Sequence, residues 1–597
     1  MVSESYNEKI NATSSKIEKQ SKKLKVIMYL RIGTFALLLF LIYLVIKLEN
    51  LNILWFLILP IVTFGFFVKY NAKEKTKLFI LKNILSINEK ELACLDGKFN
   101  SFENGKQFSD SQHSYSHDLD IFGEKSIYQY INRTTSSFSE KKLGDYFTNF
   151  TTEPLEIKNR QTAIKELATK LNWRQEFLAN GQYFKSQKKE IEELTNWKAN
   201  EISIFKNTGL WKILLWIIPI LVITSTYLCV QGYISNFYLI LIYIVPLSLV
   251  GQKLKIINEQ YVKISKYLDV LNQNNILSQF IENENFESEK LNNIKSKLLS
   301  NNKNASDEIS KLAGITQQLD NRSNPIFAFV MNALFLWDLN YVFKLKKWLL
   351  SNEGKIKNWF EAVYEMEVFT SFANYHYNNP TYIFPKLSEN IVLKTTEIGH
   401  PLLLEKNRVN NDFEIKNIQN FVIITGANMA GKSTFLRTIG TNITLAMCGL
   451  PVCAKEFEFT PIPIFSSMRT SDSLSENESY FYSELKRLKM IVDKLKNGEK
   501  LFVILDEILK GTNSKDKAEG SKKFVKQLLK YQVAGIIATH DLSLCSVKED
   551  FPTAVENNYF DVEIINDKLD FDYKLKLGIC SNMNAEFLMK KMGIVSE

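Results

Sequence analysis

The sequence predicts a chain of the α plus α/β class, with two apolar helical hairpins, a middle region of long helices and a C-terminal domain built on a parallel sheet. Four apolar runs each approach the roughly 20 residues that a bilayer-spanning helix needs. Glycine and proline are rare in residues 119–200 and 253–377, where apolar residues recur at helical spacing. From about residue 390, short β-type runs alternate with helical stretches, which is the pattern of an α/β domain.

The apolar runs form two pairs. Residues 26–46 hold one charge, Arg31, and residues 51–68 hold none. The second pair lies within 40 consecutive uncharged residues, 213–252, with a polar break at 231–236. We therefore expect two transmembrane hairpins. The alternative is that these runs are buried helices of a large soluble core.

Basic residues flank both pairs and predict their orientation. They are Lys16, Lys19, Lys22, Lys23, Lys25, Lys69, Lys73, Lys75, Lys77, Lys206, Lys212, Lys253 and Lys255. Because such flanks stay in the cytoplasm, we expect a multi-pass protein of the inner (cytoplasmic) membrane whose C-terminal domain faces the cytoplasm. A fifth apolar run, 326–343, contains Asn332, Asp338 and Asn340, so we expect a buried helix of the soluble region there.

Residues 71–117 are predicted to be a polar linker with a short helix. Near its end, in SDSQHSYSHD (109–118), His113, His117 and Asp118 could form a metal site. No further ligand follows at a fixed helical spacing, so we expect a solvated loop. The net charge of +9, from 74 basic and 65 acidic residues, allows contact with nucleic acid or anionic lipid and equally fits an ordinary surface.

A phosphate-binding motif opens the C-terminal domain. FVIITGANMAGKSTFLRTIG (421–440) runs from an apolar strand through a glycine-rich turn into a helix and satisfies G-x-x-x-x-G-K-[ST]. In this setting backbone N–H groups and the helix N-terminus bind phosphate oxygens, Lys432 reaches the β- and γ-phosphates, and Ser433 ligates Mg²⁺. The motif therefore predicts ATP and Mg²⁺ as ligands. The expected nucleotide-binding residues are Gly426, Ala427, Asn428, Met429, Ala430, Gly431, Lys432, Ser433 and Thr434.

Two further strands end in groups suited to ATP hydrolysis. LFVILDE (501–507) is an apolar strand that ends in Asp506, a candidate Mg²⁺ ligand, and Glu507, a candidate for polarising the attacking water. GIIATHD (535–541) ends in His540, which could sense the γ-phosphate. By itself His540 would be an ordinary strand-end histidine, but the two preceding motifs favour a catalytic role beside Glu507.

These motifs resemble a known family. TGANMAGKSTFLRTIG closely resembles the P-loop of the MutS DNA mismatch-repair ATPases, whose ATPase domain is of the ABC type, and DEILKGTNS (506–514) resembles the run that follows in that family. GHPLL (399–403) resembles the entry to its ATPase domain, and SDSLSENESYFYSEL (471–485) resembles its signature loop. In that loop a serine reaches the nucleotide of the partner subunit, and by position this serine is Ser479. The tail at 573–594 resembles the closing strand and helix of the family.

The resemblance extends to the helical lever core of the family. It covers 118–147, 160–167 and 361–375, with the second hairpin between the two lever portions. The implied layout is an N-terminal tail with the first hairpin (1–70), a linker (71–117), the first lever segment (118–205), the second hairpin (206–254), the second lever segment (255–388) and the ATPase domain (389–597).

The chain also departs from the family pattern. We expect neither the mismatch-reading domain nor the connector domain, because the first hairpin and the linker occupy the residues before Asp118. The second hairpin lies about where the family inserts the clamp that closes on DNA. Within the ATPase motifs, Leu509 stands at a family glycine position and Lys510 replaces an arginine.

The resemblance implies a membrane-anchored, homodimeric MutS-like ATPase that binds duplex DNA in an ATP-dependent manner, mostly through phosphate contacts and with weak sequence selectivity. One alternative is an ATP-driven membrane machine whose lever helices transmit ATPase closure to the hairpins. Another is a nucleotide-switched scaffold for partner proteins. Neither alternative requires DNA.

Overall fold

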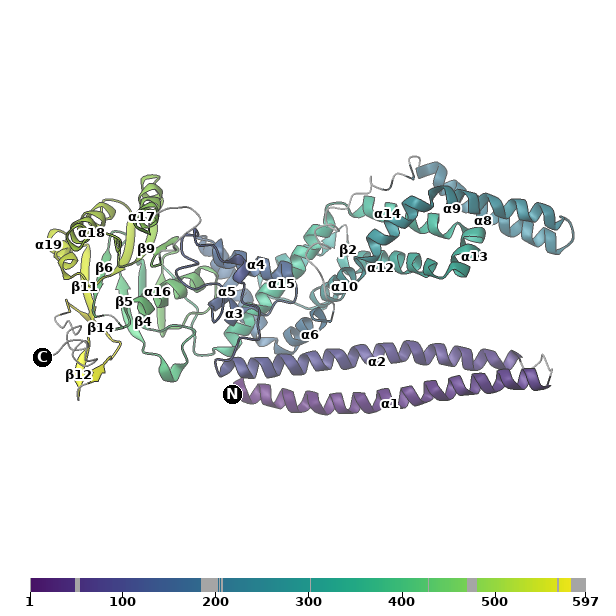
Figure 1. The fold of residues 1–597 in the computed structure, drawn as a ribbon, viewed down its shortest axis with the longest axis horizontal. Coiled ribbons are helices and arrows are strands. Elements are labelled where there is room, and N and C mark those ends of the chain that lie inside the picture. Colours follow the sequence, from purple (N-terminus) through teal and green to yellow (C-terminus); the bar gives the residue numbers. More distant parts are fainter. Residues whose placement is uncertain are drawn as a thin grey trace.

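The protein extends from an α/β body at one end, through a helical body, to two apolar helix pairs that point away from the α/β body (Figure 1). This computed structural model describes residues 2–48, 54–183, 202, 204–205, 208–300, 302–427, 429–469, 480–565 and 568–580.

The first helix pair is far longer than its apolar runs. Helix α1 (Val2–Leu48) packs along α2 (Leu54–Leu95). The expected polar linker is wrong over its first half, because residues 71–95 continue α2. This stretch contains no glycine or proline that would end the helix. Its polar end packs on α6 (Leu171–Gly181), so the hairpin is fixed to the helical body.

The second pair consists of α8 (Thr208–Val230) and α9 (Asn236–Ser265). All four helices are long and apolar enough to cross a membrane, and at most 11% of the residues in each apolar window are buried. Trp55 and Trp216, for example, are 75% and 71% exposed. The described helices therefore do not form the buried core that was the alternative for these runs.

The fifth apolar run is two helices. Helix α13 (Pro325–Phe335) and α14 (Trp337–Asn352) are bent by 77° at Leu336, whose φ of 50° breaks the helix. The expectation of one buried helix is wrong for α13, where Ile326 and Phe329 are 77% and 62% exposed. It holds for one face of α14, which packs on α9 and α12.

Short helices rather than long arms make up the first portion of the helical body. The capping serine Ser136 begins one of them and Pro154 begins another, and both residue types favour new helix starts. Helix α15 (Lys355–Asn378) is buried along most of its length and contacts helices from both portions of the body. The remaining elements are α3 (Ile127–Ile131), α4 (Ser137–Thr148), α5 (Pro154–Thr169), α10 (Leu268–Asn283), α11 (Glu289–Ser296), α12 (Ala305–Asp320), β1 (Leu299–Ser300) and β2 (Lys303–Asn304).

The expected solvated loop at 109–118 is wrong at its end, which is an internal contact. Ser116 and Asp118 are each 1% exposed, and Asp118 accepts hydrogen bonds from Ser466 and Arg487 of the α/β body. His113 Nδ1 accepts from the backbone of Ser116 at 3.1 Å. Among the described residues, no His, Cys, Asp and Glu cluster could hold a metal ion.

The α/β body contains a six-stranded sheet in the order β14-β11-β6-β10-β9-β8, parallel except for β14. A four-stranded sheet in the order β3-β7-β4-β5 lies beside it. The predicted parallel sheet from about residue 390 is thus present. The strands are β3 (Lys386–Leu387), β4 (Leu393–Ile398), β5 (Asn411–Ile415), β6 (Phe421–Thr425), β7 (Glu456–Phe459), β8 (Ile464–Ser467), β9 (Leu501–Asp506), β10 (Val533–Ala538), β11 (Val555–Phe560), β12 (Glu563–Ile565), β13 (Lys568–Asp570) and β14 (Leu575–Leu577). The helices are α16 (Lys432–Met447), α17 (Tyr480–Lys496), α18 (Ser514–Leu528) and α19 (Val547–Asp550).

Candidate nucleotide site

The glycine-rich turn connects the fully buried strand β6 to α16. Gly426 has a φ of 149°, and a Cβ there would lie 2.7 Å from the carbonyl oxygen of Phe560. Gly431 has a φ of 99° immediately before the helix. At Gly426 a side chain would collide with the Phe560 carbonyl oxygen. At both Gly426 and Gly431 the positive φ is unfavourable for any residue with a side chain, so the turn itself requires the two motif glycines.

Lys432 lies at the first position of α16 and is turned back over the loop. Its Nζ donates to the carbonyl oxygens of Gly426 and Ala427 at 2.7 and 2.8 Å. Burial lowers the pKa of Lys432, although Glu507 and Asp506 oppose this effect. The ammonium is therefore desolvated and held where an anionic ligand of the loop would meet it.

The remaining P-loop residues differ in their surroundings. Ser433 and Thr434 line a cavity at the N-terminus of α16, and Ala430 is buried. Met429 is 81% exposed with a φ of 69°, and its side chain also lines this cavity. The predicted Asn428 lies outside the described residues.

The predicted carboxylates and histidine meet at neighbouring strand ends. Strands β9 and β10 are parallel and pair Asp506 with Ala538, which places Glu507 and His540 just beyond the same edge of the sheet. Glu507 has a φ of 51°, and its carboxylate is 2.9 Å from Nδ1 of His540. Burial raises the pKa of Glu507, but His540 and nearby lysines outweigh it, so the pKa lies below its ordinary value. Glu507 is therefore ionised and oriented by His540.

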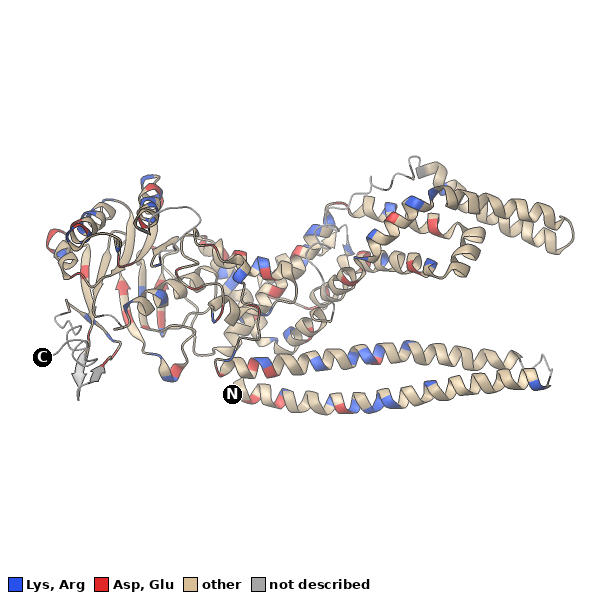
Figure 2. Ribbon diagram, in the orientation of Figure 1, with Lys and Arg blue, Asp and Glu red and all other residues tan. Residues whose placement is uncertain are grey.

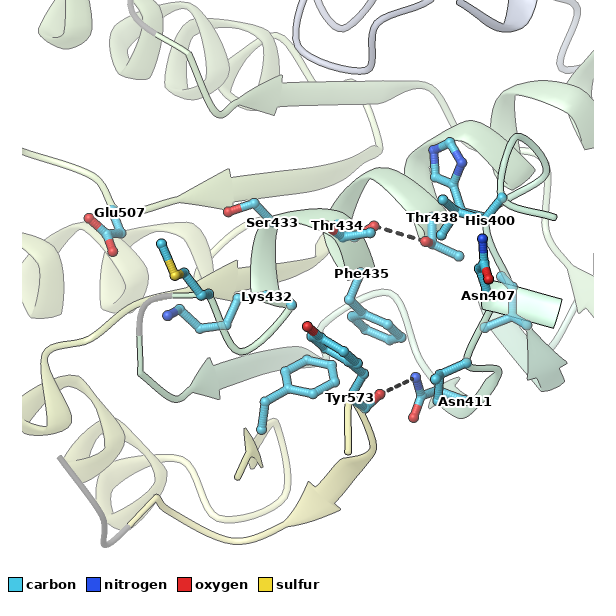
Figure 3. A pocket seen from close by; sticks show the side chains of 16 residues that line it. His400, Asn407, Asn411, Lys432, Ser433, Thr434, Phe435, Thr438, Glu507 and Tyr573 are labelled. Atoms are coloured by element: carbon cyan, nitrogen blue, oxygen red, sulfur yellow. Dashed lines mark hydrogen bonds between the residues drawn. The ribbon is translucent and has the colours of Figure 1, made fainter. Parts of the chain in front are cut away.

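Lys432, Ser433 and Glu507 line one cavity of about 500 Å³. Figure 3 shows Lys432 and Glu507 toward one side of it. Asp506 and His540 are not among its described lining residues.

The opposite side of the cavity was missed from the sequence. His400, Asn407 and Asn411 line it, and Asn411 donates to the carbonyl oxygen of Tyr573 at 3.0 Å (Figure 3). The ring of Tyr573 also lines the cavity but lies next to the loop, where a Cβ at Gly431 would be 3.0 Å from it. Burial, together with Arg437, lowers the pKa of His400 to about 4, so its ring is neutral at physiological pH. The sequence signals near these residues were GHPLL, which contains His400, and the tail resemblance, which begins at Tyr573; neither singled out a binding residue.

Glu484 is a second residue that the motifs did not single out. Its carboxylate accepts from the backbone N–H groups of Leu509 and Lys510, directly after the catalytic candidates. Burial raises its pKa, which these two donors partly offset. Glu484 thus ties α17, which follows the predicted signature loop, to the Glu507 segment. Ser479 lies outside the described residues.

The donors fit a magnesium ion. Ser433 supplies a hydroxyl in the first turn of α16, Asp506 supplies a carboxylate at the end of β9, and α16 packs against β9. Such hard oxygen ligands are those that Mg²⁺ prefers, usually together with water and phosphate oxygens.

Comparison with known proteins agrees with this geometry. Residues 422–588 match the model of MutS domain V. The chain is 32% identical over 199 residues to the DNA mismatch repair protein MutS of Thermotoga petrophila, covering 33% of this chain and 25% of that protein. It is 30% identical over 214 residues to MutS protein homolog 4 of Homo sapiens, covering 34% and 22%. It is 29% identical over 250 residues to Endonuclease MutS2 of Carboxydothermus hydrogenoformans, covering 41% and 31%.

The chain thus spans less than a third of the length of each of these three relatives. The segment that matches MutS domain V, residues 422–588, contains the P-loop, the Asp506–Glu507 pair and His540. This chain is a homologue of the MutS-family ATPases and carries their domain V, the ATPase domain.

Proposed function

We propose that this protein is a membrane-anchored, homodimeric MutS-type ATPase that binds duplex DNA under the control of ATP. The principal support is the convergence of Lys432, Ser433 and Glu507 on one cavity in a domain homologous to MutS domain V.

The cavity suits a nucleotide that lies along it with its phosphates at the Lys432 side. Lys432 would leave the loop carbonyls to bind the β- and γ-phosphates. Ser433 and Asp506 would hold Mg²⁺, which neutralises phosphate charge when bound. Glu507, kept ionised by its hydrogen bond to His540, would accept a proton from the attacking water.

The side of the cavity away from Lys432 suits the adenine ring of ATP. His400 offers a ring surface there, and the side-chain amide of Asn407 offers both a donor and an acceptor. The ring of Tyr573 lies between this side and the loop. Ser479, by the family resemblance, would reach the nucleotide of the partner subunit.

The Lys432→Ala variant tests the site. It should lose ATP binding and hydrolysis, whereas Lys530→Ala, an exposed lysine beyond α18, should keep both. Equal hydrolysis in the two variants would disprove the site assignment.

Anchoring in the membrane is supported by the four exposed apolar helices and their basic flanks. Both pairs point away from the α/β body, and their far ends are almost free of charged residues (Figures 1 and 2). Apolar surface of this extent rarely remains open to water in soluble proteins. Protease or labelling reagents applied to sealed vesicles should reach the α/β body only from the cytoplasmic side.

The DNA proposal is supported by the relatives described as DNA mismatch repair proteins and by the net positive charge. Lys and Arg alternate with Asp and Glu along the described helical body (Figure 2). The proposal is that binding is mostly through phosphate contacts, so it should weaken steeply with salt and show weak sequence selectivity.

The deciding experiment is duplex binding by detergent-purified protein at two salt concentrations, with matched and mismatched duplexes, with and without ATP. Salt-sensitive binding that ATP modulates is expected. Absence of binding at low salt in a preparation that hydrolyses ATP would reject the DNA proposal.

A second candidate, an ATP-driven membrane machine, is favoured by the way the first hairpin joins the body. Tyr6 of α1 is fully buried and donates to Asn378 at the end of α15 at 2.7 Å. Glu91 of α2 accepts from Asn378 at 2.8 Å and pairs with buried Arg133. This hairpin is therefore rigidly joined to the central helix. ATP-dependent movement of the hairpin in the absence of DNA would favour this candidate.

A further inference from the structure

A second cavity, of about 670 Å³, lies between the beginning of α8 and one face of α14. It is remote in sequence from the nucleotide site and belongs to the base of the second apolar hairpin. Its lining combines charged and apolar side chains from both helices: Gly209, Lys212, Leu215, Trp216, Asn340, Phe343, Lys344, Lys346, Lys347 and Leu350.

The charged portion of the wall is entirely basic among the described lining residues. Lys346 is held in place, because its Nζ donates to the carbonyl oxygens of Ile202 and Phe205 at 3.0 Å each. Lys212, Lys344 and Lys347 are exposed, and no described carboxylate lies within ion-pair distance of them. Three lysines thus line the cavity without a described counter-charge, which favours an anionic ligand. One of them, Lys344, now has its Nζ over the ring of Tyr341, 4.2 Å from the ring centroid, and would turn from that ring to meet the ligand.

The apolar portion of the wall continues along α8 toward the proposed membrane. Leu215 is 6% exposed, and Trp216 and Leu350 are 71% and 51% exposed. Lys212 immediately precedes the uncharged run 213–252, so the lysines lie at the level where lipid headgroups meet the hydrocarbon. Tryptophan is enriched at this same level of membrane proteins.

We propose that this cavity binds the phosphate headgroup of an anionic phospholipid from the cytoplasmic leaflet. Lys212, Lys344 and Lys347 contact the headgroup, and the acyl chains lie along the exposed Trp216. Basic pockets at this level of a membrane are suited to such headgroups. The inference rests on the proposed membrane placement of α8 and α9 and adds a specific lipid class to it.

The test is native mass spectrometry of the full-length, detergent-purified protein mixed with phosphatidylglycerol or with phosphatidylcholine. The wild type should retain phosphatidylglycerol in preference to phosphatidylcholine. The triple variant Lys212→Gln, Lys344→Gln, Lys347→Gln should lose phosphatidylglycerol affinity by on the order of tenfold or more, since each lysine near a charged headgroup contributes about 1 kcal/mol, or about fivefold. Lys346 is left intact because it holds the backbone.

Two further variants control for charge and folding. Replacement of the exposed lysines Lys98, Lys141 and Lys158 by Gln removes the same charge far from α8 and should not change lipid retention. Arginine at positions 212, 344 and 347 keeps the charge and should keep the binding. ATP hydrolysis by each variant reports that the protein is folded.

Equal phosphatidylglycerol retention by the wild type and the glutamine variant would overturn the proposal, as would loss that the arginine variant does not prevent. Competition by millimolar inorganic phosphate that removes all lipid preference would also overturn it, and would indicate a site for free phosphate. Vesicle labelling of cysteines introduced in α8 and α9 tests the membrane placement separately. Labelling that rejects the spans would refute the placement, whereas confirmed spans with unchanged retention would refute the lipid site alone.

Discussion

Asp118 joins the helical body to the α/β body. Its removal should weaken the contact between these two bodies without destabilising the rest of the chain. The side chain is 1% exposed and accepts from Ser466 Oγ at 2.7 Å and from Nη2 of Arg487 at 3.0 Å. It also accepts from the backbone N–H groups of Met468 at 3.3 Å and Arg469 at 3.0 Å. One carboxylate thus satisfies three donors at the end of β8 and a fourth from α17.

The Asp118→Ala variant leaves the largely buried Arg487 guanidinium without its carboxylate partner, and the free-energy cost of this loss sets the size of the effect. Loss of one partner of a buried ion pair costs about 3–5 kcal/mol. The Arg487 side chain, 11% exposed, would keep its hydrogen bonds to the carbonyl oxygens of Ser466 and His113, so we expect the lower end of this range. About 3 kcal/mol corresponds to on the order of a 100-fold increase in local opening.

Hydrogen exchange followed by mass spectrometry measures this opening at Met468 and Arg469. The matched control is Asp120→Ala, because Asp120 also pairs with Arg469 but is 45% exposed. Exposed pairs contribute about 1 kcal/mol or less, so the control should change exchange by only a few-fold. The double variant Asp118→Ala, Arg487→Met should recover some of the protection, since it removes the unpaired charge.

If Asp118→Ala and Asp120→Ala accelerate exchange equally, the buried carboxylate does not hold the joint and the reasoning fails. Faster exchange throughout the chain would also refute a local role, because the Asp118 carboxylate contacts only the β8 end and its neighbours among the described elements.

Three other perturbations test the nucleotide site. Gly426→Ala should abolish ATP binding in a fluorescent-nucleotide assay, because its Cβ would lie 2.7 Å from the Phe560 carbonyl oxygen, while Gly314→Ala, with open space around it, should bind normally. Glu507→Gln should still bind ATP but hydrolyse it about 10²–10⁴-fold more slowly in single-turnover measurements; hydrolysis at the wild-type rate would exclude Glu507 as the base. Burial and Arg437 lower the pKa of His400 to about 4. The unfolded chain therefore takes up a proton below about pH 6.5 that the native state does not bind, and stability falls by up to about 3 kcal/mol as pH drops to 4. His400→Gln should flatten this loss in urea unfolding followed between pH 7 and pH 4, and an unchanged pH dependence would show that His400 is not its source.

The nucleotide loop was predictable because its determinants are local. Gly426, Gly431 and Lys432 lie within one strand-turn-helix unit, and each is fixed by its own backbone geometry. The meeting of Glu507 and His540 follows the same kind of rule, because both come after strands of one parallel sheet and such strands end at the same edge. The two side chains lie 2.9 Å apart as a result.

The other side of the cavity could not be predicted in the same way. His400, Asn411 and Tyr573 come from three separate segments, and only the packed sheets bring them together. None of them follows a motif spacing, so the sequence offered only the GHPLL and 573–594 resemblances, and neither singled out a binding residue. Asp118 was misjudged for a related reason, because its partners Ser466 and Arg487 are 348 and 369 residues away in sequence.

The predictions for residues 326–343 and 71–95 were wrong because tertiary packing, rather than local composition, determines the structure there. The run 326–343 is largely apolar, so neither its break at Leu336 nor the exposure of Phe329 can be seen in its hydropathy. Residues 71–95 are richer in charged residues than the apolar runs before them, yet they remain helical because one face packs on α1 and α6. Polarity predicted a linker there, whereas the absence of helix breakers was the better guide.

The attachment of the first hairpin to the helical body distinguishes a simple anchor from a moving part. An anchor alone would need only a flexible tether, but Tyr6 is buried against Asn378, and Asn378 also binds Glu91. Four residues beyond Asn378, the hydroxyl of Tyr382 donates to the carbonyl oxygen of Pro401, which adjoins His400 in the wall of the nucleotide cavity. Buried polar groups tolerate few alternative arrangements, because an unpaired one costs about 1–3 kcal/mol. If the membrane-machine proposal holds, we therefore expect a nucleotide that shifts the His400 wall to act on the Tyr382–Asn378 segment and, through Tyr6 and Glu91, on the first hairpin.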